Sequence, residues 1–229
     1  MLQRVAQQYG NITSMLVTLD KHNKSYNFIA SAFACGTAGY FLTSAHTIKP
    51  HDNLGIMISR EINTFQTTKA ESLEGFAVTL VGFDPINDVA LLKANEKLDF
   101  NMPSPSAFLG DETAIKVGTS IGYLGYPYGS QGLETVKISS SIISSKILTS
   151  NGTRALQLDS SVNDGNSGGP LIDIASGKII GIITGRYSPS GPTPVAFIGG
   201  VPLGQDSNIS YAVGISYAVD LMKDEGIYV

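Results

Sequence analysis

Short runs of β-branched and aromatic residues, broken repeatedly by glycine, proline and charged turns, constrain this chain more than any other feature. Such runs are typical of strands rather than helices. One set of runs precedes residue 95 and a second set follows residue 113. They cover residues 14–20, 26–34, 39–45, 54–59, 76–84 and 88–93, then 120–127, 134–147, 154–159, 169–173, 178–184 and 208–213. The pattern predicts two all-β halves of about equal size.

The remaining segments are read from their turn residues and periodicity. Residues 95–113 contain two prolines and little periodicity, which indicates a linker. Short helices are predicted for residues 2–9 and 216–225. Residues 187–208 carry four prolines and four glycines. A loop of that length is often functional, but a mobile surface insertion fits the sequence equally well.

Composition excludes several classes of protein. With 42% hydrophobic and 15% charged residues, the chain is too apolar to be disordered. Its net charge of -4, without a basic cluster, argues against nucleic acid as the main partner. Cys35 is the only cysteine, so an internal disulfide and a thiolate zinc site are both excluded. We expect no metal and no cofactor.

Residues 25–48 lack Lys, Arg, Asp and Glu and are numerous enough to span a bilayer. They nevertheless contain several polar side chains, and Gly36 and Gly39 interrupt them. Two buried strands joined by a tight turn explain this stretch better than a membrane span. The first ten residues lack the apolar run of a signal peptide, which favours a cytoplasmic location, with a periplasmic or secreted one remaining open if a leader was trimmed.

Residues 165–170, Gly-Asn-Ser-Gly-Gly-Pro, give the clearest chemical signal. Small residues around Ser167 allow a tight turn that exposes Oγ and directs successive backbone N–H groups at one point, where they could stabilise an oxyanion. The string also fits the nucleophile elbow of α/β-hydrolases, but that fold needs a histidine after the serine. All three histidines, at 22, 46 and 51, precede Ser167, so only the order His, Asp, Ser remains.

His46 is the best candidate base, because it ends the apolar strand 39–45 and would be held rigidly there. His22 and His51 lie in polar turns, which indicates solvated loop residues. Asp88 opens the buried strand 88–93, where a carboxylate needs a partner such as an imidazole N–H. Asp84, beside a proline, is interpreted as a turn or capping residue.

Taken together, these residues resemble a trypsin-like serine protease of the chymotrypsin fold, most similar to the HtrA/Deg type. Residues 43–48, TSAHTI, match the catalytic-histidine segment of that family, and 84–93, DPINDVALLK, are similar to its aspartate segment. Residues 158–173, LDSSVNDGNSGGPLID, match the serine motif of that family. Residues 117–129, VGTSIGYLGYPYG, resemble the HtrA segment that ends in Ile-Gly-Asn-Pro-x-Gly. The similarity extends from about residue 28 to residue 213.

The resemblance implies an all-β, chymotrypsin-like fold of two antiparallel six-stranded β-barrels with short N- and C-terminal helices. Residues 1–229 would form one trypsin-like protease domain, with an N-terminal barrel at 10–94, a C-terminal barrel at 114–215 and the C-terminal helix at 216–229. His46 and Asp88 would come from the first barrel and Ser167 from the second. The oxyanion hole would lie at Gly165, Asn166 and Ser167, and the substrates would be polypeptides.

Three departures from relatives bear on regulation. Thr47 stands where secreted animal trypsins have a cysteine, so their disulfide is absent. Asn166 replaces the aspartate that captures a newly cleaved N-terminus in those trypsins, which makes that route of activation unavailable. Only a helix's worth of residues follows residue 213, so we expect no PDZ domain of the kind that HtrA proteins usually carry.

The positions of the residues that would set substrate specificity are carried over from the family by counting back from the candidate nucleophile. Six residues before Ser167 lies Ser161, which would form a neutral pocket floor. Thr184, Gly185 and Arg186 would wall the pocket, with Ser210 on the opposite wall. This predicts cleavage after small or medium apolar residues, unless Arg186 turns inward and favours glutamate.

Two functions remain open from the sequence. The first is an active serine endopeptidase, and the second is a protease-fold binding or chaperone module with latent or no turnover. Cys35, in an apolar run with no basic neighbour, is interpreted as a buried and inert thiol.

Overall fold

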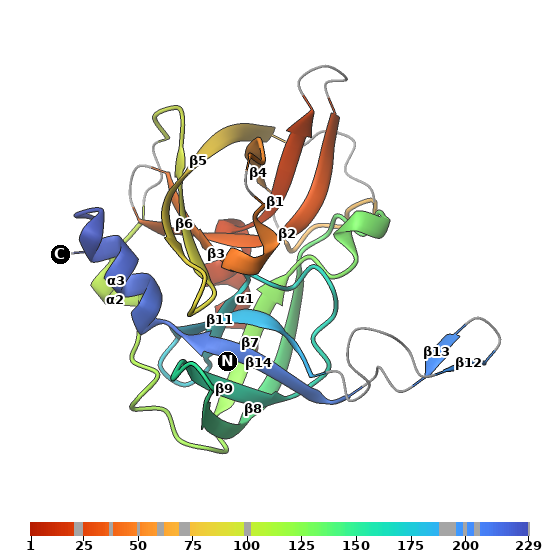
Figure 1. Ribbon diagram of the computed structural model, residues 1–229, viewed down its shortest axis with the longest axis vertical. Helices are drawn as coiled ribbons and strands as arrows, with labels where there is room; N and C mark the ends of the chain where they lie inside the picture. The colour runs from red at the N-terminus through yellow and green to blue at the C-terminus, as the bar shows by residue number, and fades with distance from the viewer. Residues whose placement is uncertain are drawn as a thin grey trace.

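A computed structural model gives the arrangement of the chain. It describes residues 1–20, 25–36, 39–49, 51–58, 62–68, 74–98, 102–187, 196–198, 201–203 and 207–228. Most of these residues form two closed barrels that lie one above the other in Figure 1.

Six antiparallel strands close the first barrel in the order β1-β2-β3-β6-β5-β4. These strands are β1 (Thr13–Asp20), β2 (Ser25–Gly36), β3 (Tyr40–Thr43), β4 (Leu54–Ile58), β5 (Glu74–Asp84) and β6 (Val89–Ala94). The second barrel closes in the order β10-β11-β14-β9-β8-β7. Its strands are β7 (Ser120–Gly125), β8 (Lys137–Leu148), β9 (Arg154–Asp159), β10 (Pro170–Asp173), β11 (Lys178–Arg186) and β14 (Ile209–Gly214). The fold class predicted from the sequence is confirmed.

Strands β3 and β6 and the second half of β2 are almost entirely buried, which explains their nearly uniform apolar sequence. Side chains along a strand point alternately to its two faces. On β2, Ala32 and Ala34 fill the barrel interior, while Phe33 and Cys35 face a second cluster shared with the other barrel. Within the uncharged stretch 25–48, residues 30–36 and 40–43 are therefore buried strand. In the described part of the chain, no helix is both long and apolar enough to cross a membrane.

Among the described residues, three helices and three short 3₁₀ turns complete the barrels. Helix α1 (Leu2–Tyr9) and helix α3 (Ser216–Asp224) both contribute buried residues to the cluster between the barrels. The 3₁₀ turns are η1 (Gly10–Ile12), η2 (Ala45–Thr47) and η3 (Gly129–Gln131). Figure 1 shows α3 against the side of the first barrel, beside β5 and β6.

The segment between the barrels is more ordered than a linker, contrary to the sequence prediction. Pro105 begins a short helix, α2 (Pro105–Phe108), because its fixed φ suits the first helical position. Phe108 and Leu109, each 3% exposed, join the cluster between the barrels. Phe108 and Leu109 therefore belong to the core.

A small hairpin departs from the second barrel between β11 and β14. Its strands, β12 (Ala196–Ile198) and β13 (Val201–Leu203), pair with each other and lie apart from both barrels in Figure 1. At the base of this insertion, the Tyr187 N–H donates to the Ile209 carbonyl at 2.8 Å. The Ser207 hydroxyl also donates to the Tyr187 carbonyl at 2.6 Å, so the two stems are joined.

Candidate active site

His46 lies one short turn beyond the end of a core strand. Strand β3 ends at Thr43, and η2 then carries His46 away from the barrel. The hydroxyl of Thr47 closes this turn by donating to the Ser44 carbonyl at 2.9 Å. The sequence prediction placed His46 directly at the strand end. The extra turn leaves the imidazole side chain 50% exposed.

Asp88 occupies a strained position just before β6. Its φ of 58° is in the left-handed region, which few residues other than glycine adopt. Asp84 supports this turn, because its Oδ1 accepts the N–H groups of Ile86 and Asn87 at 3.1 and 3.0 Å. Its Oδ2 accepts the side-chain amide of Asn87 at 2.6 Å. Asp84 is thus a turn residue, as the sequence indicated.

The structure brings His46 and Asp88 together through two groups of the histidine. The backbone N–H of His46 donates to Asp88 Oδ1 at 2.8 Å, and Nδ1 lies 2.8 Å from Oδ2. An ionised carboxylate only accepts hydrogen bonds, so Nδ1 carries the proton in this pair. In a neutral imidazole, Nε2 is then the acceptor and is suited to receive a proton.

Ser167 lies in a tight loop that only small residues permit. Gly165 and Gly168 have φ values of 98° and 85°. A Cβ on Gly165 would lie 2.3 Å from the Tyr126 carbonyl oxygen, and one on Gly168 would lie 2.0 Å from that of Ser31. Both positions therefore require glycine for its backbone conformation and for lack of space.

The hydroxyl of Ser167 does not engage His46 in this structure. It donates to the Thr184 carbonyl at 2.8 Å. Across the described residues, no hydrogen bond joins Ser167 to His46. A rotation about χ1 would be needed to bring Oγ to the imidazole, and such bonds often form only when substrate is bound.

Two peptide groups beside Ser167 have their carbonyls held in place. The Asp164 carbonyl accepts Tyr128 N–H at 2.8 Å, and the Asn166 carbonyl accepts Gly169 N–H at 3.0 Å. In a trans peptide the N–H points opposite to the carbonyl. The N–H groups of Gly165 and Ser167 therefore point away from these partners, and within the described chain neither has an acceptor.

Tyr128, which the sequence analysis missed, orients the first of these peptides. It has a φ of 59°, unusual for a residue with a side chain. Its hydroxyl also donates to Asn163 Oδ1 at 3.1 Å, a second contact with the serine loop. The sequence signals at this position were the turn-forming Tyr-Pro-Tyr-Gly at residues 126–129 and the resemblance of residues 117–129 to an HtrA segment.

The expected specificity residues lie around the same loop but do not all face solvent. Ser210 is fully buried, and its hydroxyl donates to the Ser160 carbonyl at 2.6 Å while accepting Val162 N–H at 2.9 Å. Ser210 therefore supports the segment that contains Ser161. Thr184, Gly185 and Arg186 end β11 and are partly exposed.

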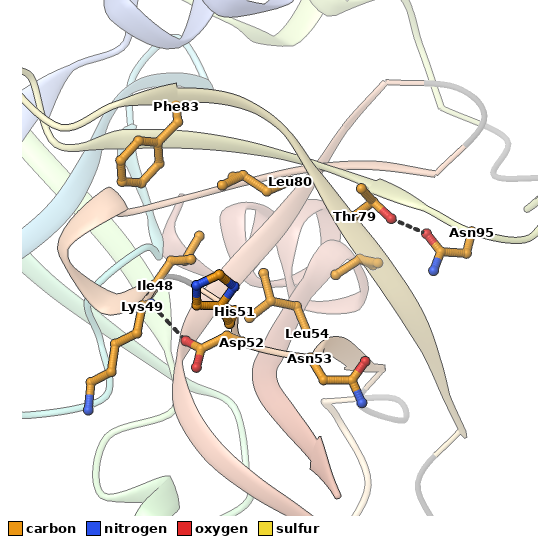
Figure 2. Close-up of a pocket in the computed structure, with 11 residues that line it drawn as sticks. Ile48, Lys49, His51, Asp52, Asn53, Leu54, Thr79, Leu80, Phe83 and Asn95 are labelled. Atoms are coloured by element: carbon orange, nitrogen blue, oxygen red, sulfur yellow. Dashed lines mark hydrogen bonds between the residues drawn. The ribbon is translucent and has the colours of Figure 1, made fainter. Parts of the chain in front are cut away.

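Cavities lie beside the first barrel and at its junction with the second. One, of about 430 Å³, has Leu80 and Phe83 of β5 on one side and residues 48, 49 and 51–54 on the other, as Figure 2 shows. Its lining includes His51 but not His46. A second cavity, of about 420 Å³, includes Asp88 and Thr184. His22 lies outside the described residues.

Nothing in the described part of the chain forms a cluster of metal-binding side chains. Cys35 is completely buried, and burial raises the pKa of its thiol far above its usual value. The thiolate needed for nucleophilic or redox chemistry is therefore strongly disfavoured.

The known proteins that this chain resembles in sequence and in fold are named as proteases. A 32% identical relative over 163 residues is the probable periplasmic serine endoprotease DegP-like of Bartonella henselae, covering 70% of this chain and 28% of the relative. Protease Do-like 1, chloroplastic, of Arabidopsis thaliana is 32% identical over 181 residues, covering 75% and 38%. The structure of the HtrA-type protease AlgW with decapeptide has a TM-score of 0.71 at 23% identity, covering 98% of this chain and 67% of that one, and it supports the fold.

This chain thus spans about a third of the length of these curated relatives. Their names place them in the periplasm or the chloroplast, and they give no support to the cytoplasmic location expected from the sequence. The family model described as the trypsin-like peptidase domain matches residues 30–182. This chain therefore belongs to the trypsin-like peptidase domain family.

Proposed function

We propose that this chain is a serine endopeptidase in which Ser167, His46 and Asp88 act as a catalytic triad. The hydrogen bond between His46 Nδ1 and the Asp88 carboxylate carries the proposal, because it leaves Nε2 as a proton acceptor. Membership of the trypsin-like peptidase family and the serine endoproteases among its relatives give independent support.

The proposed reaction begins when Ser167 Oγ rotates from the Thr184 carbonyl towards His46. Oγ attacks the peptide carbonyl carbon while its proton passes to Nε2, and Asp88 stabilises the resulting imidazolium. The N–H groups of Gly165 and Ser167 donate to the oxyanion. Collapse expels the amine, which takes the proton from His46, and water then hydrolyses the acyl-enzyme by the same steps.

Peptide hydrolysis by Ser167→Ala and His46→Ala tests the triad. Each variant should lose activity by a factor on the order of 10⁴ or more while remaining folded. Ser144→Ala and His51→Ala are matched controls, because both residues are exposed and lie outside the triad. Turnover near the wild-type rate in Ser167→Ala or His46→Ala would refute the assignment.

A protease-fold binding or chaperone module is the second candidate function. The bond from Ser167 Oγ to the Thr184 carbonyl favours it, because a serine held in this way is not activated by His46. A fluorophosphonate probe separates the two functions, since labelling requires an activated serine. Labelling of the wild type but not of Ser167→Ala supports the peptidase, whereas unlabelled wild type supports the binding module.

We further propose that cleavage follows small or medium apolar residues. Ser161, at the presumed pocket floor, offers no carboxylate, so a buried substrate Arg or Lys would be an unpaired charge. A positional-scanning peptide library tests this preference. Dominant cleavage after Lys or Arg would refute the pocket assignment. Dominant cleavage after Glu that disappears in Arg186→Ala would instead assign Arg186 to substrate binding.

A further inference from the structure

Ser31, on β2 of the first barrel, contacts the serine loop of the second barrel. Its side chain is completely buried. Its hydroxyl donates to the Gly165 carbonyl at 2.6 Å and accepts Tyr126 N–H at 3.0 Å. Its backbone N–H donates to the Ser167 carbonyl at 2.8 Å. A single residue therefore joins three separate segments at the point where the barrels meet.

These bonds fix the peptide groups that directly follow the two residues whose N–H groups face the proposed oxyanion. Ser31 holds the carbonyl of Gly165 through Oγ and the carbonyl of Ser167 through its own N–H. Glycine has more backbone freedom than any other residue, so Gly165 needs an external restraint to keep one conformation. The hydrogen bond from Ser31 Oγ to the Gly165 carbonyl restrains rotation about ψ of Gly165, which would change the conformation of the serine loop.

The Ser31 hydroxyl can restrain the serine loop because burial keeps solvent water from competing for its hydrogen bonds. A buried polar group has no water with which to exchange its partners, so its hydrogen bonds hold a defined geometry. The Thr43 hydroxyl in turn donates to the Ser31 carbonyl at 2.8 Å, which anchors Ser31 within its own barrel. The restraint on the serine loop thus originates in the rigid core of the first barrel.

We propose that Ser31 is a positioning residue that holds the oxyanion donors Gly165 and Ser167 in place from the opposite barrel. The proposal rests on the proposed peptidase function and adds a residue that touches neither substrate nor the reacting atoms. It predicts that loss of the Ser31 hydroxyl weakens transition-state binding and leaves substrate binding nearly unchanged.

The test compares Ser31→Ala with Thr13→Val. Both residues are completely buried, and both substitutions remove one hydrogen-bonding hydroxyl, but that of Thr13 donates to the Tyr9 carbonyl at 2.8 Å rather than to the serine loop. For Ser31→Ala, kcat should fall about 10- to 100-fold with KM changed less than about threefold. The inhibition constant of a peptide boronate, whose oxygen occupies the oxyanion position, should rise by the same factor. Thr13→Val should alter these constants less than about threefold, although it lowers stability.

Equal kcat and boronate affinity in Ser31→Ala and Thr13→Val would overturn the proposal. Ser31→Cys covers the case in which Ser31→Ala does not fold, because a thiol is of similar size but a weaker hydrogen-bond donor. Its kcat should lie below that of the wild type, and a wild-type kcat would also overturn the proposal.

Failure of the peptidase function is recognised separately. Wild-type protein that neither hydrolyses peptides nor reacts with a fluorophosphonate would refute that function. The positioning role is then read from crystal structures of the wild type and Ser31→Ala. Displaced Gly165 and Ser167 N–H groups in the variant support the role of Ser31, and unmoved groups overturn it.

Discussion

Asp88 combines a proposed chemical role with a backbone conformation that few side chains tolerate. Left-handed residues other than glycine cost roughly 1–3 kcal/mol and persist only where the surroundings hold them. Here the surroundings are the Asp84 carboxylate and the pairing of Asp88 with His46. Aspartate and asparagine adopt this conformation more readily than other residues, because their short side chains bond locally.

Asp88→Asn should therefore separate chemistry from stability. Asparagine keeps the left-handed conformation but offers His46 a neutral partner that favours the wrong tautomer, so kcat should fall on the order of 10⁴-fold. The melting temperature should change little, whereas Asp88→Val should also lower it, because a β-branched residue resists this φ. Kinetics and thermal unfolding of both variants check the prediction. Equal melting temperatures for the two variants would contradict it.

Asp84 provides the corresponding test for the turn. Asp84→Asn retains one carboxamide oxygen for the N–H groups of Ile86 and Asn87, so its effect on the rate should be mild. Asp84→Ala removes every acceptor and should destabilise the fold by about 1–2 kcal/mol, with a larger loss of activity. Urea unfolding and steady-state kinetics measure both effects. The prediction fails if Asp84→Asn is as damaging as Asp84→Ala.

Among the secondary-structure elements, α1 is hydrogen-bonded to the second barrel through the side chain of Tyr9. Tyr9 is 1% exposed, and its hydroxyl donates to the Gly177 carbonyl in the turn between β10 and β11. Burial raises the pKa of Tyr9 from 10.0 to about 12, because the phenolate would lose its hydration. The helix therefore depends on a neutral hydroxyl.

This raised pKa predicts a loss of stability in alkali. Between pH 10 and about 12, Tyr9 ionises in the unfolded chain while remaining protonated in the folded one. The unfolded state then binds fewer protons, so the free energy of unfolding falls by up to about 1.4 kcal/mol per pH unit for this group. Urea unfolding at several pH values should show a shallower decline in Tyr9→Phe than in the wild type. Parallel declines would refute the assignment.

The strands could be predicted because their chemistry is local. Phe41 and Leu42, for example, face different clusters, and an uninterrupted apolar run is what a strand buried on both faces requires. The short helix at Pro105 was missed because Phe108 and Leu109 find their partners only in the folded core. Short elements follow tertiary contacts more than propensity.

The residues of the candidate site also divide into those that local motifs predict and those that depend on tertiary contacts. Ser167, His46 and Asp88 were predicted from local motifs, since the proposed chemistry restricts the residue types there. Ser31 was not, because its partner Gly165 is 134 positions away and its own neighbours are apolar. The bond between Ser167 and Thr184 likewise depends on a rotamer that no sequence pattern specifies.

At the scale of the whole molecule, bonds across the junction hold the site. Besides Ser31, Thr153 of the second barrel donates to Asn87 Oδ1 at 2.7 Å, next to Asp88. Thr153→Val should destabilise the protein by about 1–3 kcal/mol by leaving a buried contact unmade. Its kcat should also fall, and Ser150→Ala, an exposed change in the same turn, serves as the control. Equal effects in both variants would contradict a role for the junction.

The chain terminus provides a further prediction. Met1 is 84% exposed, while Asn166 is 4% exposed and uncharged, so an ion pair between the amino group and residue 166 is not available. Protein carrying a fused N-terminal extension should match the cleaved protein in kcat/KM within about twofold. Parallel assays before and after removal of the extension provide the measurement. Activity confined to the cleaved protein would contradict this.

The joined stems at Tyr187, Ser207 and Ile209 make the segment between them exchangeable. Because the two ends are already hydrogen-bonded to each other, closing them with a shorter chain requires little rearrangement of β11 or β14. Replacing residues 188–206 by a tight turn should leave a folded barrel, and longer inserts should be accepted at the same point. This position therefore gives the molecule an attachment site beside its proposed substrate pocket, where length and composition can change without altering the barrel that supports it.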